Sequence, residues 1–125
     1  MAQKICIVED EDQIREIYQI ALAEDGFQVF AAADGEAGME VISRERPDLA
    51  LIDLMMPKKD GITLMKEMLA DPELAKIPVI ILTNFGSEEM IEKVKDLQSR
   101  FYLVKSQYQP KDVVKIVREV LHTKD

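Results

Sequence analysis

An acidic residue follows the apolar run 49–52, where it would end a strand buried on both faces. Burial disfavours the charged form of a carboxyl group, so Asp53 needs a nearby counter-charge or a bound cation. Other candidate strands also end in polar residues, namely Glu9 and Asp10 after 4–8, Thr83 at the end of 77–83, and Lys105 after 101–104. Each of these residues alone has an ordinary explanation as a loop, cap, turn or surface residue. Their joint occurrence at strand ends indicates a shared site.

The residue types at these strand ends favour phosphoryl chemistry. Carboxylates without histidine or cysteine suit a hard divalent cation such as Mg²⁺, which keeps several waters and binds phosphate oxygens. A lysine and a threonine complement phosphate oxygens by charge and hydrogen bonding. An aspartate beside such a cation can act as a nucleophile and form an aspartyl phosphate. The cation and the lysine would neutralise the charge of the transferred phosphoryl group.

The elements that must position this site alternate five times between strand and helix patterns. Apolar runs predict strands at 4–8, 27–32, 48–53, 77–83 and 101–104. Helical spacing of apolar residues predicts helices between them, including 62–70, one capped by Ser87, and a last one beginning near Pro110. This order is typical of an α/β fold with a parallel sheet covered on both faces. Ligands bind at the carboxyl ends of the strands in such a sheet.

Composition excludes several classes of protein. The chain has 125 residues, enough for one domain, and a formal net charge of -8 that disfavours nucleic acids and anionic membranes as partners. The single cysteine, Cys6, is expected in the core, and the single histidine, His122, on the surface. The sequence has no Walker loop, GxGxxG or Ser-His-Asp set, and no membrane-span or signal-peptide pattern. We therefore expect a soluble cytoplasmic protein.

Four motifs carry a resemblance to a known family. They are "IVEDE" at 7–11, "LIDLMMPKKDG" at 51–61, "ILT" at 81–83 and "FYLVK" at 101–105. With these motifs the whole chain resembles a receiver domain of the two-component response regulators, of the stand-alone type. The resemblance implies a flavodoxin-like three-layer sandwich with five helices and a five-stranded parallel sheet of order 2-1-3-4-5. It also implies that residues 1–125 form a single receiver domain.

The resemblance assigns expected roles to the residues at the strand ends. Asp53 would be the phosphoacceptor, taking a phosphoryl group from a histidine kinase or a phosphotransfer protein. The ligands of Mg²⁺ or Mn²⁺ would be Glu9, Asp10, Asp53 and the backbone carbonyl of Met55, with Asp10 bound directly and Glu9 through a water. Contacts to the phosphoryl group and the conformational switch would come from Thr83, Lys105 and Tyr102.

The sequence departs from the family pattern at several positions. Ser106 follows Lys105, where the family often has a proline preceded by a cis peptide bond. A cis bond before a residue other than proline costs about 2.5–4 kcal/mol. Whether the Lys105–Ser106 bond is cis or trans therefore stays open. Residues 97–100 replace the usual glycine-containing turn. Asn84 is larger than the small residue that the family generally has after the threonine, and it is expected to narrow the access of a phosphodonor to Asp53. Met55 and Phe85, both bulky, are hypothesised to slow hydrolysis of the aspartyl phosphate.

These features predict a phosphorylation-activated switch that catalyses only its own phosphorylation and dephosphorylation, so it is not a turnover enzyme. Its output would pass to a protein partner docked on the helix after Ser87, strand 101–104 and the helix from Pro110. Three alternatives stay open: a phosphate-independent pseudo-receiver, a receiver cut from a larger DNA-binding regulator, and a phosphorelay member that passes the group onward. A flavodoxin-like electron carrier is disfavoured, because no flavin phosphate loop follows strand 4–8.

Overall fold

The computed structural model describes residues 2–84, 88–97, 99 and 101–124. Its strands form one parallel sheet in the order β2-β1-β3-β4-β5, which confirms the expected order. The strands are β1 (Lys4–Val8), β2 (Gln28–Ala32), β3 (Leu49–Ile52), β4 (Val79–Thr83) and β5 (Phe101–Val104). The carboxyl ends of β1, β3 and β4 therefore lie side by side at one edge of the sheet.

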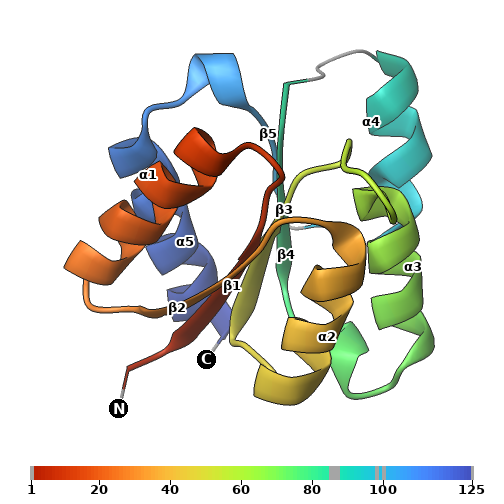
Figure 1. Cartoon of the computed structure of the whole chain (residues 1–125), viewed down its shortest axis with the longest axis horizontal. Coiled ribbons are helices and arrows are strands. Elements are labelled where there is room, and N and C mark those ends of the chain that lie inside the picture. Colours follow the sequence, from red (N-terminus) through yellow and green to blue (C-terminus); the bar gives the residue numbers. More distant parts are fainter. Residues whose placement is uncertain (1, 85–87, 98, 100, 125) are drawn as a thin grey trace.

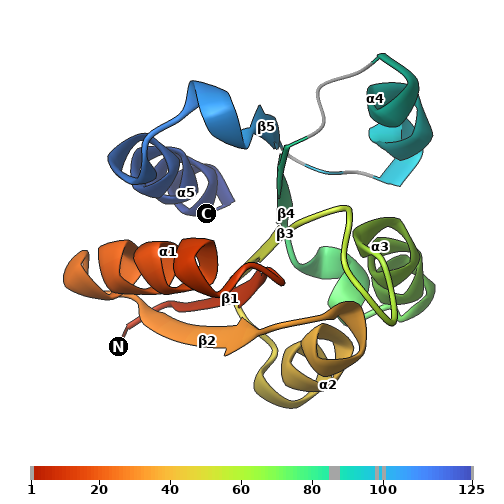
Figure 2. The same ribbon diagram turned by 45° about the horizontal axis from the view of Figure 1, so that its top comes forward.

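Helices cover both faces of the sheet, as Figures 1 and 2 show. They are α1 (Asp12–Glu24), α2 (Gly35–Glu45), α3 (Gly61–Ala70), α4 (Glu88–Val94) and α5 (Pro110–Lys124). Three short 3-10 turns accompany them: η1 (Leu74–Lys76), η2 (Lys95–Leu97) and η3 (Lys105–Gln107). Helices α1 and α5 pack on one face, and α2, α3 and α4 on the other. The predicted flavodoxin-like three-layer sandwich is confirmed.

The central strands are apolar along their length because both of their faces are covered. Side chains alternate between two cores, as the strand period of two requires. Cys6 and Val8 of β1 point to the core beneath α2 and α3, whereas Ile5 and Ile7 point to the core beneath α1 and α5. Cys6 is fully buried and His122 is exposed, as expected from the sequence.

The bounds of β1 and β5 match the prediction, those of β2, β3 and β4 differ by one or two residues, and proline explains the largest difference. Pro78 has no backbone N–H to donate to the sheet, so β4 begins at Val79 and not at residue 77. The carbonyl of Pro78 still accepts a hydrogen bond from the Ala50 N–H at 3.0 Å. No cis peptide bond occurs among the described residues, so Ser106 follows Lys105 in trans, within η3. The predicted cap Ser87 and two residues of the 97–100 turn lie outside the described residues.

Candidate metal centre

Three carboxylates meet where β1 and β3 end. Val8 is paired with Ile52 in the sheet register, so the residues that follow them, Glu9 and Asp53, are neighbours. The Asp53 N–H donates to the Val8 carbonyl at 3.1 Å, which continues the sheet pairing for one more residue. Carboxylate oxygens of Glu9, Asp10 and Asp53 all lie within 4.8 Å of one another. The structure thus brings together the three acidic residues that the sequence indicated.

Lys105 supplies the counter-charge that Asp53 requires. Its Nζ lies 3.2 Å from Asp53 Oδ2 and 2.6 Å from Glu9 Oε1. Its side chain is only 7% exposed, and those of Glu9 and Asp53 are similarly buried. Lys105 follows the edge strand β5, so its long side chain must reach past β4 to meet these acids. A buried carboxylate at the end of a core strand is therefore compensated by a buried ammonium group.

The charges in this cluster shift the pKa of two groups. Burial raises the pKa of the Glu9 carboxyl to about 7; the hydrogen bond from Lys105 lowers it, and the charge of Asp53 raises it further. Burial alone would lower the pKa of Lys105, but its hydrogen bond to Glu9 and the charges of both acids outweigh this, so its pKa is raised. The ammonium group thus stays charged, and the carboxylates around it carry surplus negative charge.

The donor set fits a hard divalent cation. It consists of carboxylate oxygens, it contains no histidine or cysteine, and Asp10 is exposed while Glu9 and Asp53 are buried. Mg²⁺ and Mn²⁺ prefer such oxygen ligands and keep water in the remaining positions. A cation here would also neutralise the negative charge of Asp53, which adds to the effect of burial in raising the Glu9 pKa.

The remaining predicted residues lie around this cluster. Thr83 is fully buried at the end of β4, between Asp53 after β3 and Lys105 after β5. Asn84 is exposed, and its Nδ2 donates to Glu11 Oε1 at 3.4 Å, which links the end of β4 to the start of α1. Tyr102 is half-buried and packs against the core on the α2, α3 and α4 side. Phe85 lies outside the described residues.

Two supporting residues had no task assigned to them from the sequence, although Gly61 belongs to the motif at 51–61. A Cβ at Gly61 would lie 2.2 Å from the Asp53 carbonyl oxygen, so only glycine allows α3 to begin this close to Asp53. Arg15 Nη1 donates to the Glu9 carbonyl at 2.9 Å, and its Nη2 donates to Asp12 Oδ1 at 2.6 Å. The "DG" pair at 60–61 and the i,i+3 spacing of Asp12 and Arg15 were the available signals.

Residues 5–118 of the chain match the family model of the response regulator receiver domain. The chain belongs to this family. Receiver domains act in two-component signalling, and the acidic cluster described above is the candidate metal-binding site of this one. Among the described helices, none combines the length and the apolar character needed to cross a membrane.

Individual relatives support the same family. Sporulation initiation phosphotransferase F of Bacillus subtilis is 37% identical over 105 residues, which cover 84% of this chain and 83% of that protein. A CheY-like receiver domain protein from Methanospirillum hungatei has a TM-score of 0.89 at 26% identity, covering 99% of this chain and 97% of that one. The Mn²⁺-bound form of response regulator Rcp1 has a TM-score of 0.79 at 31% identity, covering 94% and 91%. By contrast, this receiver spans only 50% of the probable transcriptional regulator ycf27 of Porphyridium aerugineum, at 34% identity over 123 residues.

Proposed function

We propose that this receiver is a phosphorylation-activated signalling switch in which Asp53 accepts a phosphoryl group from a histidine kinase or a phosphotransfer protein. A carboxylate oxygen of Asp53 attacks the phosphorus of a phosphohistidine, the P–N bond breaks, and the imidazole nitrogen leaves with its electron pair. The observation that carries the proposal is the ammonium group of Lys105, 3.2 Å from Asp53 Oδ2 within the acidic cluster.

The surrounding residues have separate tasks in this proposal. A divalent cation would be held by Glu9, Asp10, Asp53 and the Met55 carbonyl, and it would supply positive charge to the phosphoryl oxygens. Lys105 also pairs with the phosphoryl oxygens, which requires its Nζ to give up part of its contact with Asp53 Oδ2. Thr83 donates its hydroxyl to the phosphoryl group, and Tyr102 changes rotamer in response.

We further propose that the partner that reads the switch docks on α4, β5 and α5. Two large apolar side chains on this side are exposed, Ile91 of α4 at 44% and Phe101 of β5 at 40%. Large apolar side chains exposed on these elements are candidate contacts for a protein partner. A partner that binds equally well to Ile91→Ser and Phe101→Ser variants would contradict this part of the proposal.

Met55 is proposed to set the lifetime of the aspartyl phosphate. Its side chain is 52% exposed beside Asp53, where an apolar group would hinder the attacking water. We expect a polar residue at this position to shorten the phosphoryl lifetime several-fold. The measurement is the decay of the phosphorylated protein in wild type and Met55→Asn, and an unchanged decay rate would rule out this role.

The proposal treats residues 1–125 as one receiver domain that catalyses only its own phosphorylation and dephosphorylation. It applies equally to a receiver that works alone and to one within a longer regulator. A phosphate-independent pseudo-receiver is the alternative, but it would not require the buried Lys105–Asp53 pair to be present at this edge of the sheet.

Intact mass spectrometry after incubation with Mg²⁺ and a small acyl phosphate tests the proposal. We expect a single phosphoryl adduct that hydroxylamine removes, as it removes acyl phosphates. The adduct should be absent from Asp53→Asn and from samples with a chelator, and present in Asp60→Asn, a matched aspartate that caps α3. A wild-type protein without an adduct, both with the acyl phosphate and with a phosphorylated histidine kinase, would favour the pseudo-receiver.

A further inference from the structure

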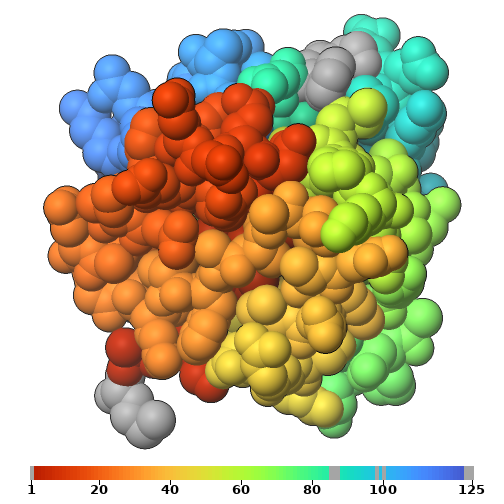
Figure 3. Space-filling view, viewed as in Figure 1, coloured from red at the N-terminus to blue at the C-terminus, as the bar shows by residue number. Residues whose placement is uncertain are grey.

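The first turn of α2 lies directly against the loop between β3 and α3, residues 54–60. A Cβ at Gly35 would lie 2.0 Å from the carbonyl oxygen of Lys59 and 2.7 Å from its Cβ. Because the nearest atom is backbone, an added methyl group must displace the loop. Figures 1 and 2 show the start of α2 beside this loop in both views, and Figure 3 shows their atoms in contact at the surface.

An ion pair adds a second contact between the same two segments. Asp34 Oδ2 lies 3.7 Å from Lys58 Nζ, and Asp34 also caps α2 by accepting from the Ala37 N–H at 2.8 Å. Lys58 has a φ of 65°, in the left-handed region that residues other than glycine rarely adopt. The contacts from α2 therefore hold a backbone conformation that Lys58 would not prefer alone.

Other contacts also fix the loop, so a displacement of Lys59 would move the rest of the loop with it. Lys59 Nζ pairs with Glu67 Oε1 of α3 at 2.6 Å, and the Lys59 N–H donates to the Pro57 carbonyl at 2.7 Å. The Gly61 N–H donates to the Leu54 carbonyl at 2.9 Å, which closes the loop onto its own beginning beside Asp53. Met55, whose carbonyl is a proposed cation ligand, lies within this closed loop.

We propose that Asp34 and Gly35 are positioning residues for the metal centre. Asp34 pairs with Lys58 and Gly35 lets α2 pack directly against Lys59, and these contacts fix the loop that presents the Met55 carbonyl. The inference rests on the cation site of the proposed function. Residues behind the ligands commonly set metal affinity, because they hold the ligands in place. Coupling of this kind is reciprocal. A cation bound at the site would therefore strengthen the contact between the loop and the start of α2.

Calorimetric titration of the purified chain with Mn²⁺ and with Mg²⁺ tests the inference, with Gly38→Ala as the matched control. Gly38 lies on the same helix, and its added Cβ would meet the Val8 side chain at 2.8 Å and not the loop. We expect Gly35→Ala to weaken cation binding about tenfold. Gly38→Ala should change the affinity less than about twofold at a comparable loss of stability.

Two surface variants keep the test valid if Gly35→Ala folds poorly. Asp34→Asn retains a good helix cap but loses the ion pair, and Lys58→Gln removes the other partner. Each should weaken cation binding about twofold, the range expected of a partly exposed pair. The double variant should bind the cation no more weakly than either single variant. Mg²⁺ should also slow hydrogen exchange of the Ala37 amide in wild type and not in Asp34→Asn.

The outcomes separate this inference from the function on which it rests. A wild-type protein that binds neither cation would overturn the metal site and the inference with it. A wild type that binds, together with Gly35→Ala and Asp34→Asn variants of unaltered affinity, would overturn the inference alone. Affinity losses that simply track the stability losses of all the glycine variants, Gly38→Ala included, would also overturn it.

Discussion

Glu9 is a candidate cation ligand whose carboxylate also forms the shortest contact with Lys105 in the acidic cluster. Its carboxylate is 2.6 Å from Lys105 Nζ, closer than Asp53 at 3.2 Å, and it is almost fully buried. A glutamate has one more methylene than an aspartate, so its carboxylate can reach Lys105. The same burial raises the pKa of Glu9 to about 7, so its charge changes near neutral pH.

This shifted pKa makes stability depend on pH in a defined direction. The pKa of Glu9 is raised from a usual value of 4.5, so between these two values the folded chain holds a proton that the unfolded chain releases. With divalent cations removed, we expect wild type to lose about 1–3 kcal/mol relative to Glu9→Gln as the pH rises from about 5 to 8. Lys105 adds no slope in this window, since its pKa is raised further above neutrality by its contacts with the two acids.

Urea unfolding of the two proteins across this pH range is the measurement. Glu73→Gln is a suitable control, because Glu73 lies on the surface near η1 and far in sequence from the site. Parallel profiles for wild type and Glu9→Gln would show that Glu9 has an ordinary pKa in the folded protein.

The residue types of the site were predictable, but their contacts were not. Asp53, Asp10 and Lys105 follow strands of a parallel sheet, so topology alone brings them to one edge. Which acid Lys105 prefers depends on side-chain lengths and rotamers, which a sequence pattern does not contain. The need for glycine at Gly61 likewise arises only from the close approach of α3 to the Asp53 carbonyl.

At the scale of elements, the strongly apolar strands and the capped helices were predictable, and the ends of some elements were not. Asp60 caps α3 and Pro110 begins α5, as local rules suggest. The start of α2 follows Asp34, but its contact with the 54–60 loop comes from packing between segments distant in the sequence. Local signals thus specify elements, whereas tertiary contacts specify how they fit.

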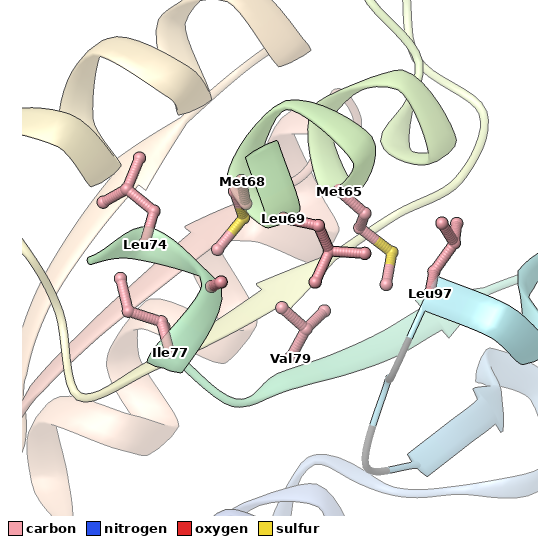
Figure 4. Close-up of a pocket in the computed structure, with 8 residues that line it drawn as sticks. Met65, Met68, Leu69, Leu74, Ile77, Val79 and Leu97 are labelled. Carbon is pink, nitrogen blue, oxygen red and sulfur yellow. The ribbon is translucent and has the colours of Figure 1, made fainter. Parts of the chain in front are cut away.

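One imperfect fit lies between α3 and the sheet, where apolar side chains surround a small cavity of about 20 Å³. Figure 4 shows these side chains. Its lining comes from α3, η1, β4 and η2, and comprises Met65, Met68, Leu69, Leu74, Ala75, Ile77, Val79 and Leu97. The lining offers no polar side chain that could hold a water molecule. An apolar group that fills the space would therefore gain van der Waals contacts without displacing a bound water.

Filling this cavity should stabilise the fold. We expect Val79→Ile to raise the free energy of unfolding by about 0.5–1 kcal/mol, because the added methylene enters space that is already present. The control is Val113→Ile, at a fully buried position of α5 where the added group should cost about 1 kcal/mol or more by overpacking. Urea unfolding measures both, and a destabilised Val79→Ile would mean that the cavity cannot accept the larger side chain.

At the scale of the whole molecule, the charge balance favours cations. The chain carries 24 acidic against 16 basic residues, and among the described residues three carboxylates gather in the acidic cluster of Glu9, Asp10 and Asp53. Monovalent salt screens the general repulsion of this surface, whereas a divalent ion bound at the cluster removes repulsion among buried carboxylates. The two effects are separable, because only the second requires Asp10.

We expect Mg²⁺ at ten times its dissociation constant to raise the midpoint of thermal unfolding by about 5 °C, since binding to the folded state alone adds about 1.4 kcal/mol. Sodium chloride at matched ionic strength should give a smaller increase. Asp10→Asn should lose the Mg²⁺-specific part, because Asp10 is exposed and its replacement leaves the buried Glu9–Lys105 pair intact. Equal increases with both salts, or an undiminished Mg²⁺ effect in Asp10→Asn, would mean that Mg²⁺ stabilises this receiver only by screening.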